Sequence, residues 1–201
     1  MNKIILAGLV AENPTFSHEV YGEKFYIFHL SSSRKSGTQD VLPCIVSEIL
    51  KKNIEAGTEV KICGNIRTRN VHKDDKIHLE ITVFVKEVLA YEEDENYVVL
   101  DGFICKDPTY RELPFGRKVT DLIVANNRPY TGKSDYIPTI AWGRMEIKSS
   151  EFEVGTRVKI FGRLQSREYV KRLDDGTEET RVAYELSANR VDVVEESEGE
   201  E

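Results

Sequence analysis

The segment VKIFGRLQSREY, residues 158–169, alternates between apolar and polar positions with a period of two. One face of it carries Val158, Ile160 and Leu164. The other face carries basic, amide and aromatic side chains: Lys159, Phe161, Arg163, Gln165, Arg167 and Tyr169. This alternation predicts a half-buried β-strand whose open face is basic and aromatic.

The same period of two recurs along the chain, and turn-forming sequences such as YGEK and DDGT separate the strands that it predicts. Short helices are expected between the third and fourth strand of each half, at residues 47–53 and 144–150. Strands are predicted at residues 2–11, 25–33, 40–46, 58–69, 77–90, 96–105, 117–126, 135–142, 156–170 and 180–194.

The two halves of the chain repeat one another. NKIILAG at 2–8 matches NYVVLDG at 96–102, and AGTEVKICG at 56–64 matches VGTRVKIFG at 154–162. Repeats of this length are whole domains, because solenoid units are only about 20–50 residues long. Five strands with a helix between the third and fourth are typical of an OB-fold barrel, although periodicity alone leaves other small barrels open. We therefore predict an all-β protein with two tandem five-stranded OB barrels, each with a short helix.

The charges indicate where the domains end. The net charge is −7, but residues 92–95 (EEDE) and 195–201 (EESEGEE) hold nine of the 35 acidic residues. Each half is close to neutral once these segments are set aside. We therefore predict an OB domain at 1–91, an acidic linker at 92–95, a second OB domain at 96–194 and a disordered acidic tail at 195–201.

Several classes of protein are disfavoured. Cys44, Cys63 and Cys105 are widely spaced and form no CxxC pair, which is typical of reduced structural cysteines and not of a zinc site. No apolar run approaches the ~20 residues of a membrane span, and we see no signal-peptide pattern, so a cytoplasmic location is expected. No catalytic motif stands out, and we expect neither an enzyme nor a cofactor or metal.

The second half resembles the bacterial single-stranded DNA-binding protein family. The resemblance rests on NYVVLDGFICKDP, on LIVANNR at 122–128, on SDYIPTIAWGR at 134–144 and on GTRVKIFGRLQSREY, in that order. Residues 2–69 follow the same frame more loosely. The resemblance implies an OB fold and single-stranded DNA binding. It also implies the form with two OB domains per chain, in which a homodimer supplies four.

Single-stranded DNA exposes flat bases and a charged backbone, so a binder needs aromatic faces and cations. Tyr136 and Trp142 lie six residues apart on one strand and share a face, and with Tyr169 they match stacking positions of the family. The candidate stacking residues are Trp142, Tyr136, Tyr169, Tyr130 and Phe161. The candidate phosphate contacts are Arg128, Lys133, Arg144, Lys159, Arg163, Arg167, Lys171 and Arg172.

The first half lacks these rings. Val41, Ser47 and Val71 stand where the second half has Tyr136, Trp142 and Tyr169. Stacking contributes ~1–3 kcal/mol per base, so we expect the first half to bind DNA more weakly. Its candidate contacts are the cations Arg34, Lys35, Arg67 and Arg69.

The sequence thus favours a non-catalytic protein of replication, recombination or repair that binds single-stranded DNA without strong sequence preference. Two alternatives stay open: an OB-fold interaction protein of the replisome or primosome with weak affinity for nucleic acid, and an RNA-binding protein. Replication or repair proteins are possible partners, but the acidic tail lacks the hydrophobic tip by which the family recruits them.

Overall fold

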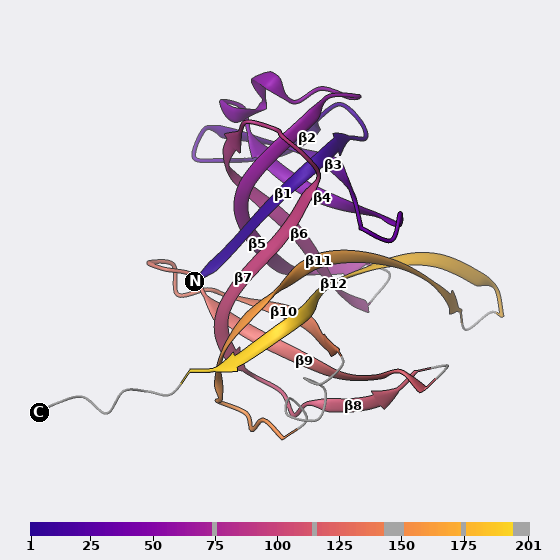
Figure 1. Ribbon diagram of the computed structural model, residues 1–201. Helices are drawn as coiled ribbons and strands as arrows, with labels where there is room; N and C mark the ends of the chain where they lie inside the picture. The colour runs from indigo at the N-terminus through magenta and orange to yellow at the C-terminus, as the bar shows by residue number, and fades with distance from the viewer. Residues whose placement is uncertain (74–75, 114–115, 143–150, 174–175, 195–201) are drawn as a thin grey trace, which may run out of the picture. The chain divides into compact units, whose positions relative to one another are not determined.

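A computed structural model describes residues 1–73, 76–113, 116–142, 151–173 and 176–194 (Figure 1). Strands of the first copy are β1 (Asn2–Val10), β2 (Thr15–Val20), β3 (Glu23–Ser33), β4 (Gln39–Ser47), β5 (Glu59–Lys73) and β6 (Lys76–Leu89). Strands of the second copy are β7 (Glu95–Ile104), β8 (Thr109–Glu112), β9 (Lys118–Asn127), β10 (Ser134–Trp142), β11 (Arg157–Arg172) and β12 (Glu178–Val193).

Each copy closes into a barrel. In the first copy, β1 pairs with both β3 and β5, β3 pairs with β4, β4 runs parallel to β6, and β5 pairs with β6. In the second copy, β7 pairs with β9 and β11, β9 pairs with β10, β10 runs parallel to β12, and β12 neighbours β11. This closed five-strand order is that of an OB fold, and the predicted tandem barrels are confirmed.

The duplicated glycines near the ends of β1 and β7 explain part of the sequence repeat. A Cβ atom added to Gly8 would lie 2.0 Å from the carbonyl oxygen of Ser31, and one added to Gly102 would lie 2.5 Å from that of Ala125. At these points one strand passes between two pairing partners and the backbones approach closely, so only glycine fits.

Two features depart from the predicted elements, and one predicted element is not tested. Short strands β2 and β8 were not predicted, because TFSHEV and TYRE are largely exposed and show no apolar alternation. The helix predicted at 47–53 is a single 3-10 turn, η1 (Leu50–Asn53). The helix predicted at 144–150 lies outside the described residues.

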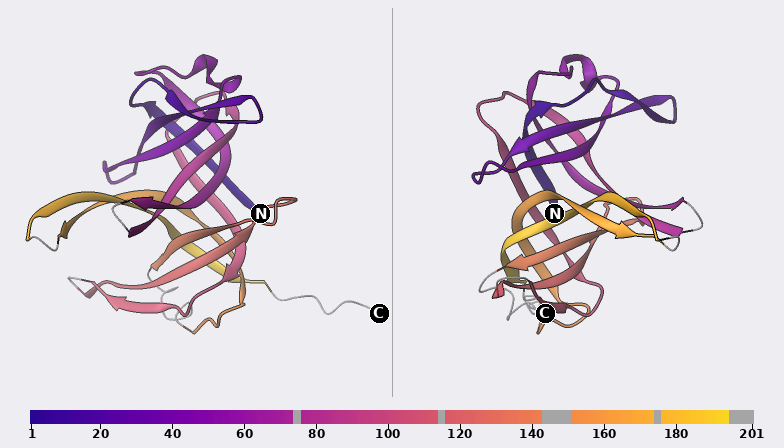
Figure 2. Two further views of the ribbon diagram at one scale, coloured as in Figure 1. Left: turned by 180° about the vertical axis from the view of Figure 1, so that it is seen from behind. Right: turned by 90° about the vertical axis from the view of Figure 1, so that its right-hand side faces the viewer.

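The chain forms two compact units whose limits differ from the predicted linker. The first, here the N unit, contains Lys3–Tyr97 and Leu164–Glu185, and the second, the C unit, contains Met1–Asn2, Val98–Arg163 and the remainder of the chain from Leu186. The outer part of the β11–β12 hairpin therefore belongs to the N unit, although its sequence belongs to the second copy. Figure 2 shows this hairpin, orange to yellow, as a long curved two-stranded ribbon. The predicted boundaries at 91 and 96 stay a prediction.

The interior of both barrels is mostly aliphatic, with Phe28 also wholly buried in the first copy. Ile4, Leu6 and Ile62 are wholly buried in the first copy, and Leu100 and Ile137 are wholly buried in the second. Within the described residues, no helix has both the length and the apolar character that crossing a membrane requires.

Candidate nucleic-acid interface

A row of side chains crosses three strands on the outer face of the second barrel. Ala125 of β9 is paired with Phe103 of β7 on one side and with Tyr136 of β10 on the other. Residues paired in this way project from the same face of a sheet. Phe103 is 38% exposed and Tyr136 is 49% exposed. Neighbouring strands lie about 4.8 Å apart, so two rings flank a small residue across roughly 10 Å, which suits a flat base. We call these three residues the aromatic row.

A cation extends the aromatic row. Arg157 of β11 is paired with Phe103, on the side opposite Ala125. Its guanidinium donates hydrogen bonds of 3.1 and 3.0 Å to the carboxylate of Asp101. These bonds lower the pKa of Asp101. Their effect exceeds that of desolvation, which acts in the opposite direction. The carboxyl group is therefore ionised at neutral pH and partly neutralises the arginine.

The first copy has the same row with different chemistry. Ser31 of β3 is paired with Leu9 of β1 and with Val41 of β4, and Leu9 is also paired with Glu59 of β5. Leu9 and Val41 are 46% and 40% exposed. The first copy thus places two aliphatic side chains and an acid where the second copy places two rings and an arginine. This difference favours the second copy as the site for bases and phosphates.

Trp142 lies at the far end of the same face of β10. It is paired with Val119, which in turn is paired with Arg111 of β8. The side chain is only partly exposed, and its indole Nε1 atom is buried with no hydrogen-bond acceptor among the described residues. Tyr136 and Trp142 therefore share a face, as their spacing predicts, but the indole is less open than the phenol.

Tyr169 and Arg167 lie on the part of β11 that belongs to the N unit. The Arg167 guanidinium carbon is 5.7 Å from the centroid of the Tyr169 ring, and the two side chains are 54% and 37% exposed. Arg167 also lies 3.7 Å from the carboxylate of Glu185 on β12. The pair offers an exposed ring and a cation side by side.

Phe161 and Tyr130 have different surroundings. The ring centroid of Phe161 lies 5.6 Å from the Lys159 ammonium and 5.2 Å from the Arg190 guanidinium, so two cations already lie at cation–π distance from this ring. Tyr130 is fully exposed in the turn between β9 and β10, with a φ of 64°. A tyrosine in the left-handed region is uncommon and is typical of a tight turn or a functional loop.

Two of the predicted phosphate contacts are held by buried carboxylates. Arg128 donates hydrogen bonds of 2.9 and 2.6 Å to Asp135, which is wholly buried. Arg34 makes the same bidentate contact with Asp40, which is 1% exposed. Because these guanidiniums already compensate a buried charge, they stabilise the fold more directly than they offer charge to a ligand.

The other candidate cations are placed as follows. Lys35, Lys133 and Arg172 are exposed, whereas Lys159 and Lys171 are partly exposed. Arg69 pairs with Glu80 at 2.7 Å, and Arg67 donates to Asn65 at 3.3 Å. Arg163 is partly exposed, and its Nε atom is buried with no acceptor among the described residues. Arg144 lies outside the described residues.

The predicted site is thus divided between the two units. The C unit holds Tyr136, Trp142, Tyr130, Phe161, Arg128, Lys133, Lys159 and Arg163. The N unit holds Tyr169, Arg167, Lys171 and Arg172 together with the four cations predicted for the first copy. Phe103 was not among the predicted residues, although its alternation with buried Gly102 and Ile104 is a signal that places it on the open face. The described residues contain no cluster of His, Cys, Asp and Glu that could hold a metal ion.

The second copy matches a model of the single-strand binding protein family over residues 95–194. Single-stranded DNA-binding protein A of Bacillus subtilis is 36% identical over 80 residues, which cover 37% of this chain and 46% of that protein. Single-stranded DNA-binding protein 1 of Staphylococcus aureus is 35% identical over the same length, with 48% of that protein covered. The chain thus spans about half the length of the curated relatives that it matches.

The fold of the whole chain also has a solved counterpart. The wild-type single-stranded DNA binding protein from Thermus aquaticus superposes with a TM-score of 0.78, at 20% identity, over 100% of this chain and 96% of that one. At this identity the likeness shows the fold, and it extends over both barrels. Through residues 95–194, which include the aromatic row and the β11–β12 hairpin, the chain belongs to the single-strand binding protein family.

Proposed function

We propose that this protein binds single-stranded DNA without strong sequence preference, chiefly through its second OB barrel. The observation that carries the proposal is the aromatic row, in which Phe103 and Tyr136 flank Ala125 and Arg157 continues the line. Stacking accepts every base because each has a flat π-face, and the cations contact the backbone whatever the sequence. The family match over residues 95–194 supports the same assignment.

Titration with oligo-dT tests the proposal. Trp142 is the one tryptophan of the chain, so its fluorescence reports on the second barrel without interference. We expect quenching on binding, and an affinity that falls with salt by a logarithmic slope of about −0.7 per phosphate neutralised. Unchanged fluorescence together with no salt-dependent shift of labelled oligo-dT in a gel would reject the proposal.

The proposal extends to assembly, location and cellular role. The protein is a homodimer with four OB domains, non-catalytic and cytoplasmic, and acts in replication, recombination or repair. Mass measurement in solution, with and without oligo-dT, tests the dimer. Competition between oligo-dT and oligo-U tests the preference for DNA over RNA, since no described side chain is assigned to a 2′-hydroxyl.

The row formed by Leu9, Ser31 and Val41 in the first copy favours a second candidate function. Exposed Leu9 and Val41 suit a protein surface better than a base, as expected for an interaction protein of the replisome or primosome. This candidate predicts weak nucleic-acid binding that does not depend on Tyr136. The titration above therefore distinguishes the two functions.

Substituting Asp101 by Asn is expected to raise the affinity for oligo-dT roughly threefold, because it removes an ionised carboxylate beside Arg157 and the DNA backbone. The effect is measured by titration near physiological salt, where distant charges are screened. Glu59→Gln makes the same change of charge in the row of the first copy and should leave the affinity unaltered. A fall in affinity for Asp101→Asn would show that Asp101 orients Arg157 instead of weakening it.

A further inference from the structure

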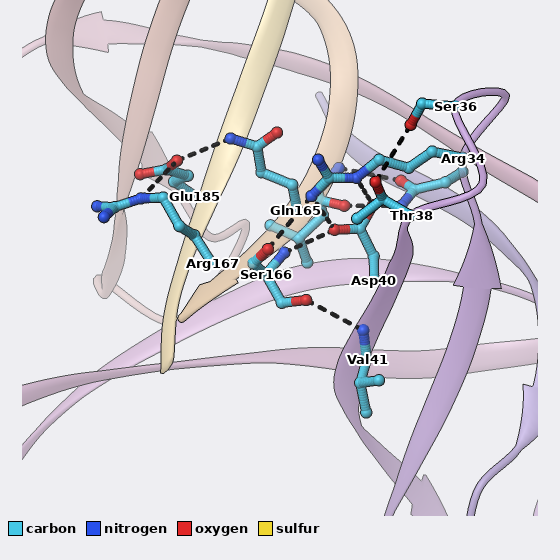
Figure 3. A network of polar contacts seen from close by, with 11 residues as sticks. Arg34, Ser36, Thr38, Asp40, Val41, Gln165, Ser166, Arg167 and Glu185 are labelled. Atoms are coloured by element: carbon cyan, nitrogen blue, oxygen red, sulfur yellow. Dashed lines mark hydrogen bonds and ion pairs between the residues drawn. The ribbon is translucent and has the colours of Figure 1, made fainter. Parts of the chain in front are cut away.

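The β11–β12 hairpin is anchored within the N unit to Arg34 in the turn between β3 and β4 and to Asp40 and Val41 at the start of β4 (Figure 3). The carboxylate of Asp40 accepts two hydrogen bonds from Arg34 and a third, of 2.8 Å, from the backbone N–H of Ser166. Asp40 belongs to β4 and Ser166 to β11, 126 residues further along the chain. A buried ion pair of the first copy therefore binds the backbone of the second copy's hairpin.

Ser166 is held through all of its polar groups. Besides its N–H, its carbonyl oxygen accepts a hydrogen bond of 3.2 Å from Arg34 Nη2. Its hydroxyl accepts one of 3.1 Å from the backbone N–H of Val41. These bonds fix both the position and the orientation of the peptide at Ser166, since the guanidinium is itself held in plane by Asp40.

The anchored residue lies beside the hairpin's candidate DNA contacts. Arg167 follows Ser166 directly, and Tyr169 lies three residues further on. Gln165, on the other side, is buried and donates a hydrogen bond of 2.7 Å to Glu185 of β12, the same carboxylate that faces Arg167 (Figure 3). Beyond this point residues 167–170 are exposed, so the partly buried Asp40–Ser166 bond lies directly before the exposed segment that carries Arg167 and Tyr169.

We propose that the Arg34–Asp40 pair is a positioning site, through which the first barrel holds the hairpin so that Arg167 and Tyr169 meet single-stranded DNA. The inference rests on the proposed function. An exposed two-stranded ribbon loses conformational freedom when it binds a ligand, and an anchor at its base reduces that loss. A barrel that lacks the rings of the aromatic row thereby still contributes to the affinity.

The closest competing interpretation gives Asp40 a role in stability alone. Removal of one partner of a buried ion pair is strongly destabilising, so Asp40→Asn lowers stability in either case. The two interpretations differ in whether the effect on DNA binding passes through Arg167 and Tyr169. A double-mutant cycle measures this directly.

Asp40→Asn keeps the size of the side chain but removes the charge that holds Arg34 and Ser166 together. In the full chain, we expect the affinity for an oligo-dT of about 16 nucleotides to fall roughly three- to tenfold. In the Arg167→Ala, Tyr169→Ala background the same substitution should change the affinity less than twofold, because the groups that it positions are absent. Hydrogen exchange should become faster at residues 166–172 of the free protein.

The outcomes separate this inference from the proposed function. Absence of oligo-dT binding by the unaltered protein would reject the proposed function. Binding by the unaltered protein, with an equal loss from Asp40→Asn in both backgrounds, would reject the positioning role. Glu12→Gln, which removes the charge from the Glu12–His29 contact of the same unit, is the control and should not alter affinity. If Asp40→Asn does not fold, Ser166→Ala takes its place, since it deletes only the bond from Val41. It must then reduce the affinity for oligo-dT by a smaller factor in the full chain and less again in the Arg167→Ala, Tyr169→Ala background. Any other result would reject the positioning role.

Discussion

Replacing Phe103 by Leu and Tyr136 by Val is expected to weaken binding of oligo-dT by about 2 kcal/mol or more, which is roughly thirtyfold. The two substitutions give the aromatic row the side chains that the first copy has at Leu9 and Val41. Both original rings are more than a third exposed, so their loss leaves no cavity in the barrel core and should change the melting temperature little. Fluorescence titration of Trp142, at several salt concentrations, measures the effect.

The salt dependence distinguishes stacking from charge. Neither substitution removes a cation, so the logarithmic salt slope should stay unchanged while the affinity falls. The matched control is Leu9→Ala with Val41→Ala, which truncates the row of the first copy and should reduce affinity less than twofold. Equal losses from the two double variants would show that both barrels bind bases alike, against the proposed asymmetry.

The barrel strands could be predicted from the sequence because they bury one face. Alternation of apolar residues marks β1, β7 and the first half of β11, and the glycines at 8 and 102 mark the same point of each copy. Strands β2 and β8 show no such alternation of apolar residues. Each pairs only with the edge of one strand, β3 or β9, and remains largely exposed.

Alternation also assigned Gln165 to the open face of β11, and this prediction is wrong. Leu164 and Gln165 are both buried, because the strand leaves the surface of the second barrel here and joins the N unit. The side chain instead bonds to Glu185. Periodicity within one strand does not show where a second surface covers it, since that depends on residues far away in the sequence.

The predicted phosphate contacts show the same limit of what a sequence alone can predict. Arg34 and Arg128 occur in basic loops and are predicted to contact phosphate, but each lies across a hairpin from a buried aspartate. A sequence does not show which guanidinium has an internal carboxylate when the two are six or seven residues apart on opposite sides of a hairpin turn. The repeat contains a signal, because an arginine and an aspartate recur together in both copies at nearly the same spacing.

Arg128→Gln is expected to lower the free energy of unfolding by about 3 kcal/mol, because it leaves Asp135 buried without its counter-ion. For a chain of this size that corresponds to a melting temperature lower by roughly 6–12 °C. Denaturant unfolding and calorimetry measure the change. Under conditions where the variant stays folded, its salt slope for oligo-dT should equal that of the unaltered protein, since this guanidinium neutralises a carboxylate and not a phosphate.

Lys133→Gln is the matched variant, because Lys133 is exposed in the turn before β10, five residues after Arg128. It should leave the melting temperature unchanged and reduce the magnitude of the salt slope by about 0.7, the contribution of one phosphate on a single strand. A double-mutant cycle of Arg128→Gln with Asp135→Asn should show strong coupling, since either substitution alone breaks the same pair. A flatter salt slope with unaltered stability for Arg128→Gln would instead place Arg128 among the phosphate contacts, and its bond to Asp135 would then have to open when DNA binds.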